Sequence, residues 1–232
     1  MPLARAYHRP TDLDEALGLL SDPQRVPLAG GTVLNADRSP SDCELVDLQL
    51  LGLNQIDTSS DMMIVGAMVD LDQLRDVCND PLIAEMCRRE MPSTLRTLAT
   101  IGGTVAAGGH DSVLLAALMV SHGVVIDSNG NDCSLDDNPE RLITAVRLEC
   151  TGATAWSLTG RTPMDTPIVA AVGRRDAAGL RVAVTGVGTR PRTVDPHDPT
   201  ADLDPPDDFR GSAAYRRHLV ATHVARVVEE LS

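Results

Sequence analysis

The chain has 232 residues and a formal net charge of −13. This acidity argues against nucleic acid or an anionic membrane surface as a partner, because both attract a basic protein face. No apolar run reaches about 18 residues and the N-terminus lacks the apolar core of a signal peptide, so we expect a cytoplasmic protein without a membrane span. Neither the five widely spaced cysteines nor the six histidines form a pattern typical of a metal site or an iron–sulfur cluster.

The N-terminal part of the chain predicts a small α+β unit. Thr11 is the expected N-cap of a helix over residues 12–21, and Asp22-Pro23 ends that helix. Further strands are expected over residues 26–29, 43–48 and 62–66, and further helices over 70–77 and 82–89. The strand over 26–29 leads into a pair of glycines at the edge of this unit.

The second half of the chain predicts an apolar helix followed mainly by strands. Asp111 or Ser112 is the expected N-cap of the helix over residues 113–120. Strands are expected at 123–126 and then at 142–148, 153–158, 168–172 and 180–185, the last four forming one antiparallel sheet. The Pro- and Asp-rich stretch 191–206 is typical of a linker. A long helix then begins near Ser212, with Arg216, Arg217 and His218 either on its solvated face or in contact with a partner.

Two similar glycine motifs are the most informative feature of the sequence. Leu28-Ala29-Gly30-Gly31-Thr32-Val33-Leu34 is echoed by Thr100-Ile101-Gly102-Gly103-Thr104-Val105-Ala106. Tandem glycines admit a positive φ and carry no Cβ that would hold a ligand away, and successive backbone N–H groups in such a turn can bind an anion. One motif alone is compatible with a tight turn, whereas two could grip the phosphates of a dinucleotide from both sides. Neither matches the Rossmann or the Walker pattern.

Four separated segments resemble a known family. Residues 7–17, 29–32, 99–103 and 208–219 are similar, in this order, to motifs of the FAD-binding (medium) subunit of the molybdenum hydroxylases, which include xanthine dehydrogenase and carbon monoxide dehydrogenase. The resemblance implies an α+β protein with the PCMH-type FAD-binding fold. Two α/β units, over residues 1–90 and 91–140, would form an FAD cleft. A small domain of antiparallel sheet and helix would follow over residues 141–232.

The resemblance also implies the residues of the cofactor site. The expected FAD-binding residues are Leu28, Ala29, Gly30, Gly31, Thr32, Val33, Leu34, Ala99, Thr100, Ile101, Gly102, Gly103, Thr104 and Asp111. The two glycine motifs would hold the pyrophosphate. Asp111 would accept a hydrogen bond from a ribose hydroxyl or would cap the following helix. Leu148 is a further expectation, for the lining around the isoalloxazine, and Arg161 and Asp165 are expected to form an ion pair.

The function implied by the resemblance is electron transfer. A [2Fe–2S] subunit would pass electrons from a molybdopterin subunit to FAD on this chain, which would hand them to NAD, a quinone or dioxygen. No catalytic side chain is expected here. The sequence departs from the family pattern at Thr104, where Asn is usual, and in the short segment 127–140, and it has few aromatic residues. A non-catalytic scaffold and a stand-alone flavin oxidoreductase therefore stay open as alternatives.

Overall fold

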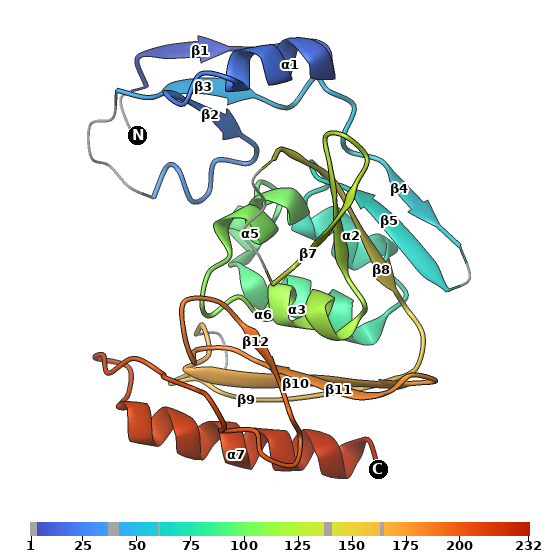
Figure 1. Ribbon diagram of the computed structural model, residues 1–232, viewed down its shortest axis with the longest axis vertical. Coiled ribbons are helices and arrows are strands. Elements are labelled where there is room, and N and C mark those ends of the chain that lie inside the picture. The colour runs from blue at the N-terminus through green and yellow to red at the C-terminus, as the bar shows by residue number, and fades with distance from the viewer. Residues whose placement is uncertain (1–3, 37–41, 60, 137–140, 163–164) are drawn as a thin grey trace.

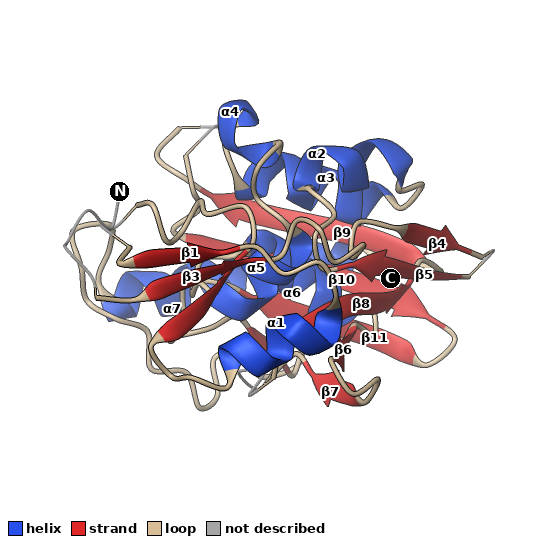
Figure 2. Ribbon diagram, turned by 90° about the horizontal axis from the view of Figure 1, so that it is seen from above, coloured by secondary structure: helices blue, strands red, loops and turns tan. Residues whose placement is uncertain are grey.

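Three packed units make up the protein in the computed structural model, which describes residues 4–36, 42–59, 61–136, 141–162 and 165–232. Figure 1 shows a small N-terminal unit, a central unit of sheet and helices, and a C-terminal sheet with a long helix beneath it. Figure 2 shows helices α2, α3 and α4 of the central unit together along one side. The architecture confirms the predicted α+β fold. No helix in the described ranges combines the length and hydropathy that crossing a bilayer requires.

The N-terminal unit is a parallel three-stranded sheet with one helix. It contains β1 (Ala6–His8), α1 (Leu13–Leu20), β2 (Arg25–Leu28) and β3 (Glu44–Asp47), in the sheet order β1-β3-β2. Asp12, not the predicted Thr11, is the N-cap of α1, because its carboxylate accepts from the Glu15 N–H at 2.8 Å. The Glu15 carboxylate accepts from the Thr11 N–H at 3.0 Å, so the cap is reciprocal and displaced by one residue.

The central unit holds the main apolar core. Its sheet contains β4 (Ile56–Thr58), β5 (Met62–Gly66), β6 (Val124–Asp127), β7 (Asp132–Ser134) and β8 (Ile143–Glu149), and its helices are α2 (Leu71–Val77), α3 (Pro81–Glu90), α4 (Ser93–Arg96), α5 (Ile101–Ala107) and α6 (Val113–Val120). The strand order is β4-β5-β8-β6-β7, with antiparallel pairs. Every residue of α6 is buried. Of the two predicted N-caps, Asp111 and Ser112, the structure shows Ser112.

The C-terminal unit corrects two predictions. Its sheet has the order β12-β11-β10-β9 and contains β9 (Ala153–Thr159), β10 (Val169–Asp176), β11 (Gly179–Val184) and β12 (Arg192–Val194). The strand predicted at 142–148 is β8, which pairs with β5 and β6 in the central sheet instead. Its place is taken by β12, which lies in the stretch predicted as a linker. Of the segment 127–140, residues 137–140 lie outside the described residues.

The C-terminal sheet is covered on both faces by helices. Along β10 the side chains alternate, so that Ala170 and Val172 join the central core while Val169 and Ala171 face α7 (Ala213–Glu230). The helix α7 begins after the predicted Ser212, whose hydroxyl accepts from the Tyr215 N–H. This two-sided burial fixes the C-terminal sheet against the central unit.

The prediction of a solvated face was wrong for Arg216. Its side chain is fully buried, and its guanidinium donates to the Ile168 carbonyl at 2.9 Å, to the Gly186 carbonyl at 3.0 Å and to the Asp208 carboxylate. Arg216 therefore ties the segment before α7 to the C-terminal sheet. A charged residue on an amphipathic helix is ordinarily exposed, and only the surrounding acceptors make its burial favourable.

Candidate functional site

The two glycine motifs lie against each other. The first follows β2, and a Cβ built on Gly30 would stand 1.6 Å from the carbonyl oxygen of Leu98, just before the second motif. Gly31 has φ of +70°, a left-handed conformation that favours glycine. On the other side, a Cβ on Gly103 would come within 3.9 Å of the Ala29 side chain. Segments far apart in the sequence thus form one seam between the N-terminal and central units.

The second motif is a helix start rather than a loop, so the expected positive φ was wrong for this copy. Gly102 and Gly103 lie in the first turn of α5, whose N-cap Thr100 accepts from the Gly103 N–H at 3.1 Å. The N–H groups of Ile101 and Gly102 donate to the carbonyls of Val69 and Ala67, both at 3.0 Å. Three donors of this turn are therefore already engaged within the protein.

The first motif differs in its free donors. Within the described ranges, the backbone N–H groups of Gly30, Gly31 and Thr32 make no hydrogen bond to another residue. Unpaired donors in a turn that contains a left-handed glycine form a concavity suited to an anion. This loop is the part of the seam that can bind a phosphate through its backbone.

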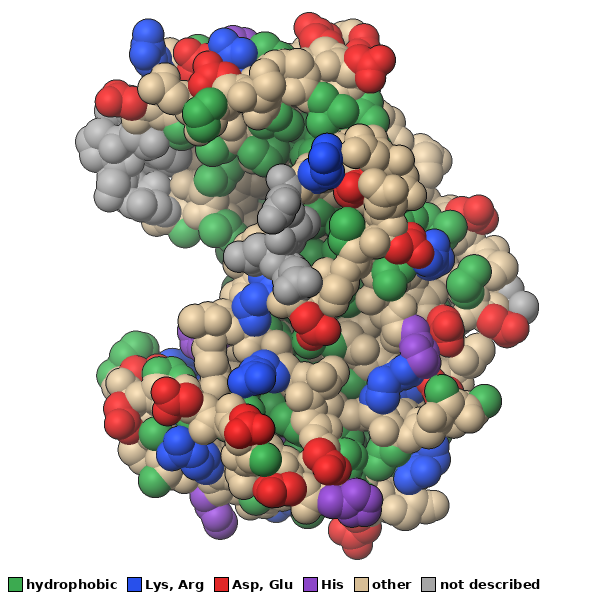
Figure 3. Space-filling model, in the orientation of Figure 1, with side chains coloured by type: hydrophobic (Ala, Val, Ile, Leu, Met, Phe, Trp, Pro, Cys, Tyr) green, Lys and Arg blue, Asp and Glu red, His purple; other side chains and the backbone are tan. Residues whose placement is uncertain are grey.

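A cavity of about 590 Å³ opens beside the seam. Ala29, Gly102 and Gly103 line it together with Leu17, Leu20, Ser21, Arg25, Pro27, Leu48, Ala67, Met68, Ala106, Ser128, Arg141, Leu142 and Ile143. The volume lies in the range of small-molecule sites, and a largely apolar wall with a few polar groups is typical of them. Figure 3 shows apolar side chains gathered on the face of the N-terminal unit that is turned toward the central unit.

A smaller cavity of about 340 Å³ lies across the seam. It shares Ala29 and Met68 with the first, and its further lining residues are Gly30, Gln49, Asn54, Asp70, Thr97, Leu98 and Thr100. Amide, hydroxyl and carboxylate groups form a larger share of the lining here than in the first cavity, where aliphatic groups dominate. An elongated ligand with one apolar and one polar end, bridged by phosphates, suits the pair of cavities.

Other expected site residues lie in different settings. Val33 is 54% exposed at the rim of the first motif, whereas Ala99, Ile101 and Thr104 are buried, so only their backbone could meet a ligand. Asp111 is not the N-cap of α6, since Ser112 occupies that position; the Asp111 carboxylate pairs with Arg210 at 3.1 Å instead. This bond joins the C-terminal signature to the segment before α6.

Two further expectations fall outside the cavities. Leu148 is fully buried in the core of the central unit and lines neither cavity. Arg161 and Asp165 form a loose pair at 3.9 Å on the surface. A pair this exposed contributes little to stability, because solvent screens it.

Sequence reasoning missed several lining residues. Leu17 and Leu20 carried only the signal of an amphipathic helix, and Leu142 that of a strand start. Arg25 was unmarked; its guanidinium donates to Glu44 at 2.9 Å, and His8 and Arg25 together hold the pKa of Glu44 below its usual value. These residues line a site only because the N-terminal and central units meet there.

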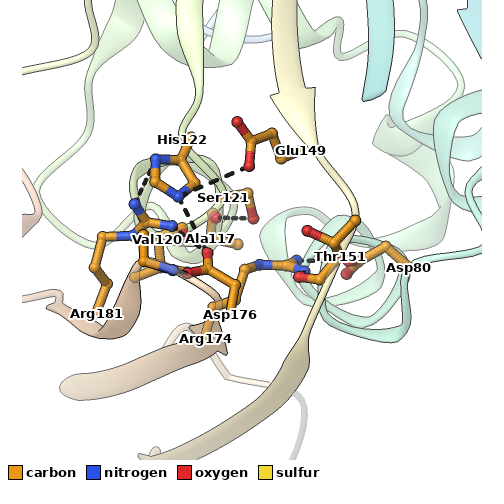
Figure 4. A network of polar contacts seen from close by, with 11 residues as sticks. Asp80, Ala117, Val120, Ser121, His122, Glu149, Thr151, Arg174, Asp176 and Arg181 are labelled. Carbon is orange, nitrogen blue, oxygen red and sulfur yellow. Dashed lines mark hydrogen bonds and ion pairs between the residues drawn. The ribbon is translucent and has the colours of Figure 1, made fainter. Parts of the chain in front are cut away.

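A second polar cluster lies between the central and C-terminal units (Figure 4). Atoms of His122, Glu149 and Asp176 that could serve as metal ligands lie within 4.8 Å of one another. Arg181 contacts Nδ1 of His122, and Nε2 of the same ring faces Asp176 at 3.1 Å. Arg181 also pairs with Asp176 at 2.7 Å, so these side chains form a polar network that joins two units.

The residues at the seam fit a flavin dinucleotide. The N–H groups of Gly30, Gly31 and Thr32, which bond to no described residue, are suitable donors to a pyrophosphate, and Gly103 presents no Cβ to a group that approaches it. An apolar cavity and a polar cavity lie on the two sides. This chain therefore has both the backbone N–H donors and the cavities that such a ligand would need.

Comparisons with known proteins show which proteins the chain is similar to. A protein of Escherichia coli K12 named "Uncharacterized protein YgfM" is 29% identical over 247 residues, covering 94% of this chain and 93% of that protein. The fold matches carbon monoxide dehydrogenase from Hydrogenophaga pseudoflava with a TM-score of 0.87 at 20% identity, covering 100% of this chain and 98% of that one. It matches quinoline 2-oxidoreductase from Pseudomonas putida 86 with a TM-score of 0.84 at 21% identity, covering 97% and 96%.

The family itself is given by a sequence model rather than by these structures. The model described as "FAD binding domain in molybdopterin dehydrogenase" matches residues 3–132, more than half of the chain. This range contains both glycine motifs and most residues that line the two cavities. The expected cofactor, FAD, is thereby confirmed as that of the family. The chain belongs to the family of FAD-binding domains of molybdopterin dehydrogenases.

Proposed function

We propose that this chain is the electron-transfer subunit of a cytoplasmic molybdopterin-containing dehydrogenase. It would take electrons from a [2Fe–2S] subunit and pass them through FAD to an external acceptor such as NAD or a quinone. The observation that carries the proposal is the first glycine motif, in which the N–H groups of Gly30, Gly31 and Thr32 bond to no described residue. Ala29 of this motif lines both cavities, and Gly30 lines the smaller one. Family membership names the cofactor that this arrangement would hold.

The chain would act by binding and orientation. The N–H groups of Gly30, Gly31 and Thr32 would donate to the pyrophosphate, and the Thr32 hydroxyl would add one donor. Gly103 would allow close approach from the side of α5, while Thr100 keeps its own N-terminal turn capped. When bound, FAD supplies the redox chemistry, accepting electrons singly and releasing them singly or in pairs. No side chain of this protein needs to act as a general acid or base.

The surroundings of the flavin ring would be mainly aliphatic. No aromatic residue is among the described residues that line either cavity. Trp156 packs against the central core, and Phe209 is 87% exposed near the start of α7. Stacking on an aromatic side chain therefore cannot contribute to affinity in these cavities, and the pyrophosphate contacts carry a larger share of it.

The surface near the seam supports association with partner subunits. Val33, within the first glycine motif, and Leu98, just before the second, are 54% and 53% exposed. Exposed apolar groups beside a cofactor site are typical of interaction surfaces, and single-electron transfer requires a donor close to the flavin. A [2Fe–2S] subunit and a molybdopterin subunit are the proposed partners, in a hetero-oligomer.

Two experiments test the proposal separately. The purified chain, titrated with FAD, should bind it and melt at a higher temperature by mass action, whereas riboflavin, which lacks the pyrophosphate, should bind far more weakly. Native purification from the source organism should recover an iron–sulfur protein and a molybdopterin protein together with this chain.

The outcomes distinguish the alternatives. Copurification without FAD, and no FAD uptake in the titration, would favour a scaffold that has lost its cofactor; the aliphatic cavity lining is the observation that keeps this alternative open. FAD binding by a chain that purifies alone would favour a stand-alone flavoprotein and would contradict the subunit assignment.

A further inference from the structure

Two cysteines lie where the central unit joins the C-terminal sheet. Cys78 is the C-cap of α2 and is buried in the central core. Cys150 directly follows β8, is partly buried and packs against the same core. Both are free thiols in this structure. They come from segments far apart in the chain, and no property of the proposed flavin site involves either of them.

One buried guanidinium holds the two segments together. Arg174 of β10 donates from one terminal nitrogen to Asp80 at 2.5 Å and from the other to the Thr151 carbonyl at 2.7 Å. Asp80 lies two residues after Cys78, and Thr151 lies one residue after Cys150. Figure 4 shows the guanidinium of Arg174 extended between Asp80 and Thr151. Since Arg174 is fully buried, neither contact is readily exchanged for water.

Further contacts hold each cysteine in place. The backbone N–H of Cys150 donates to the Asp61 carbonyl at 3.0 Å, and that of Cys78 donates to the Leu74 carbonyl at 2.9 Å. The Asp80 carboxylate is itself fixed, because it accepts from the N–H groups of Leu82 and Ile83 at the start of α3. The backbone on both sides of the pair is therefore rigidly anchored.

The two thiols interact and differ in reactivity. Interaction with the Cys150 side chain, followed by burial, raises the pKa of Cys78, and interaction with Cys78 lowers the pKa of Cys150. Burial without such a partner raises the pKa of Cys87. Cys78 is buried whereas Cys150 is partly exposed, so Cys150 is the member of the pair that a small oxidant reaches first.

We propose that Cys78 and Cys150 are a redox-active pair that forms a reversible disulfide with hydrogen peroxide as the oxidant. The Cys150 thiolate attacks one peroxide oxygen, the O–O bond breaks, and the departing hydroxide takes up a proton to become water. Cys78 then attacks the sulfur of the resulting sulfenic acid, the S–O bond breaks, and a second water leaves as the S–S bond forms. Two thiols lose two electrons and two protons, and one peroxide becomes two waters.

The position of the pair links it to both cavities. The helix α2, which ends at Cys78, is capped at its other end by Asp70 in the polar cavity. The strand β8, which precedes Cys150, begins with Ile143 in the apolar cavity. A disulfide would therefore join the far ends of two elements whose near ends line the two cavities, and would close a long loop of chain in the unfolded state.

The test uses the full chain after complete reduction and removal of the reductant. Stepwise addition of hydrogen peroxide, alkylation of the remaining thiols and peptide mapping should show a Cys78–Cys150 link before any other cysteine is oxidised. A dithiol should reverse it. Cys150→Ser and Cys78→Ala should abolish the link, whereas Cys133→Ser, the matched control on β7, should keep it. Sulfinic acid on Cys150, or a first link that involves another cysteine, would overturn the proposal.

A second readout does not depend on the variants folding well. If the folded backbone accommodates the bond, the oxidised wild-type chain should melt at a higher temperature than the reduced chain, because the cross-link restricts the unfolded state. Cys150→Ser should show no such rise on oxidation. A lower melting temperature of the oxidised wild-type chain would mean that the two sulfurs can meet only by distortion, and would contradict the proposal.

Discussion

The two glycine motifs are nearly the same in sequence and different in structure. After β2, Gly30 and Gly31 form an open turn, with a left-handed Gly31 and N–H groups that bond to no described residue. In the second copy, Gly102 and Gly103 begin α5, and the donors of that turn are engaged by Ala67 and Thr100. The first copy can donate to a ligand, whereas the second mainly provides room for one. What a short motif does is decided by the carbonyl groups that its neighbours place beside it.

The largest expected effect concerns the contact between the copies. In Gly30→Ala the new Cβ would overlap the Leu98 carbonyl, so the seam must open, at a cost of about 3 kcal/mol or more of unfolding free energy. Gly18→Ala in α1, where a Cβ meets nothing within 4 Å, is the control and should stabilise the chain by about 0.5–1 kcal/mol. Urea unfolding measures both. Equal stability of Gly30→Ala and wild type would mean that the two motifs are not in contact.

A pH titration of a histidine far from the seam separates the stability of the chain from its affinity for FAD. His223, between the Ser157 and Thr159 hydroxyls, has a pKa lowered to about 4, chiefly by burial and then by Arg226. Its contribution to stability is therefore complete above pH 6.5 and is lost as pH falls toward 4, by on the order of 2 kcal/mol. His223→Gln should flatten this dependence in denaturant titrations. His223 is remote from both motifs, so the FAD affinity of the variant at pH 7.5 should equal that of wild type.

The third expectation tests the left-handed glycine. Gly31→Ala should weaken FAD binding by roughly tenfold or more, about 1.4 kcal/mol, because the new Cβ strains φ and meets the Asn35 side chain at 2.8 Å. Gly179→Ala, at a φ of +120° in open space on the C-terminal sheet, carries backbone strain without touching the site. It should lose stability but keep its affinity. Equal affinity in both variants would exclude the first motif from the cofactor site.

The smallest effects are expected for the two threonines. One variant should lose stability, and the other should lose FAD affinity. Thr100→Ala removes the cap of α5 and should cost about 1 kcal/mol of stability. Thr32→Ala removes a hydroxyl that bonds to no described residue, so it should leave stability nearly unchanged and weaken FAD binding by about 0.5–1.5 kcal/mol. Melting curves with and without FAD measure both quantities. The reverse pattern would exchange the roles assigned to the two motifs.

The sequence predicted features that depend on local chemistry. Ser112, one of two predicted caps, was recognisable because a short polar side chain precedes an apolar helix, and the start of the last helix was expected near Ser212. The family resemblance named the fold and FAD. By contrast, nothing in the sequence of β8 indicates that it pairs with β5 and β6 rather than with β9 and β10, which follow it in the chain.

What escaped prediction depends on distant partners. Arg216 is buried because two carbonyls and Asp208 surround it, and these come from other elements. The second motif is a helix start because Ala67 and Val69 offer their carbonyls to its N–H groups. Residues such as Leu17 and Leu142 line a cavity that exists only once two units have packed together.

Amide hydrogen exchange tests the central claim most directly. Without FAD, the amides of Ile101 and Gly102 should exchange slowly, since they donate to protein carbonyls, whereas those of Gly30, Gly31 and Thr32 should exchange fast. Saturating FAD should protect the three amides of the first motif and leave the two of the second nearly unchanged. Protection confined to the second motif, or no change at Gly30, Gly31 and Thr32 while FAD is bound, would contradict the roles assigned here to the two motifs.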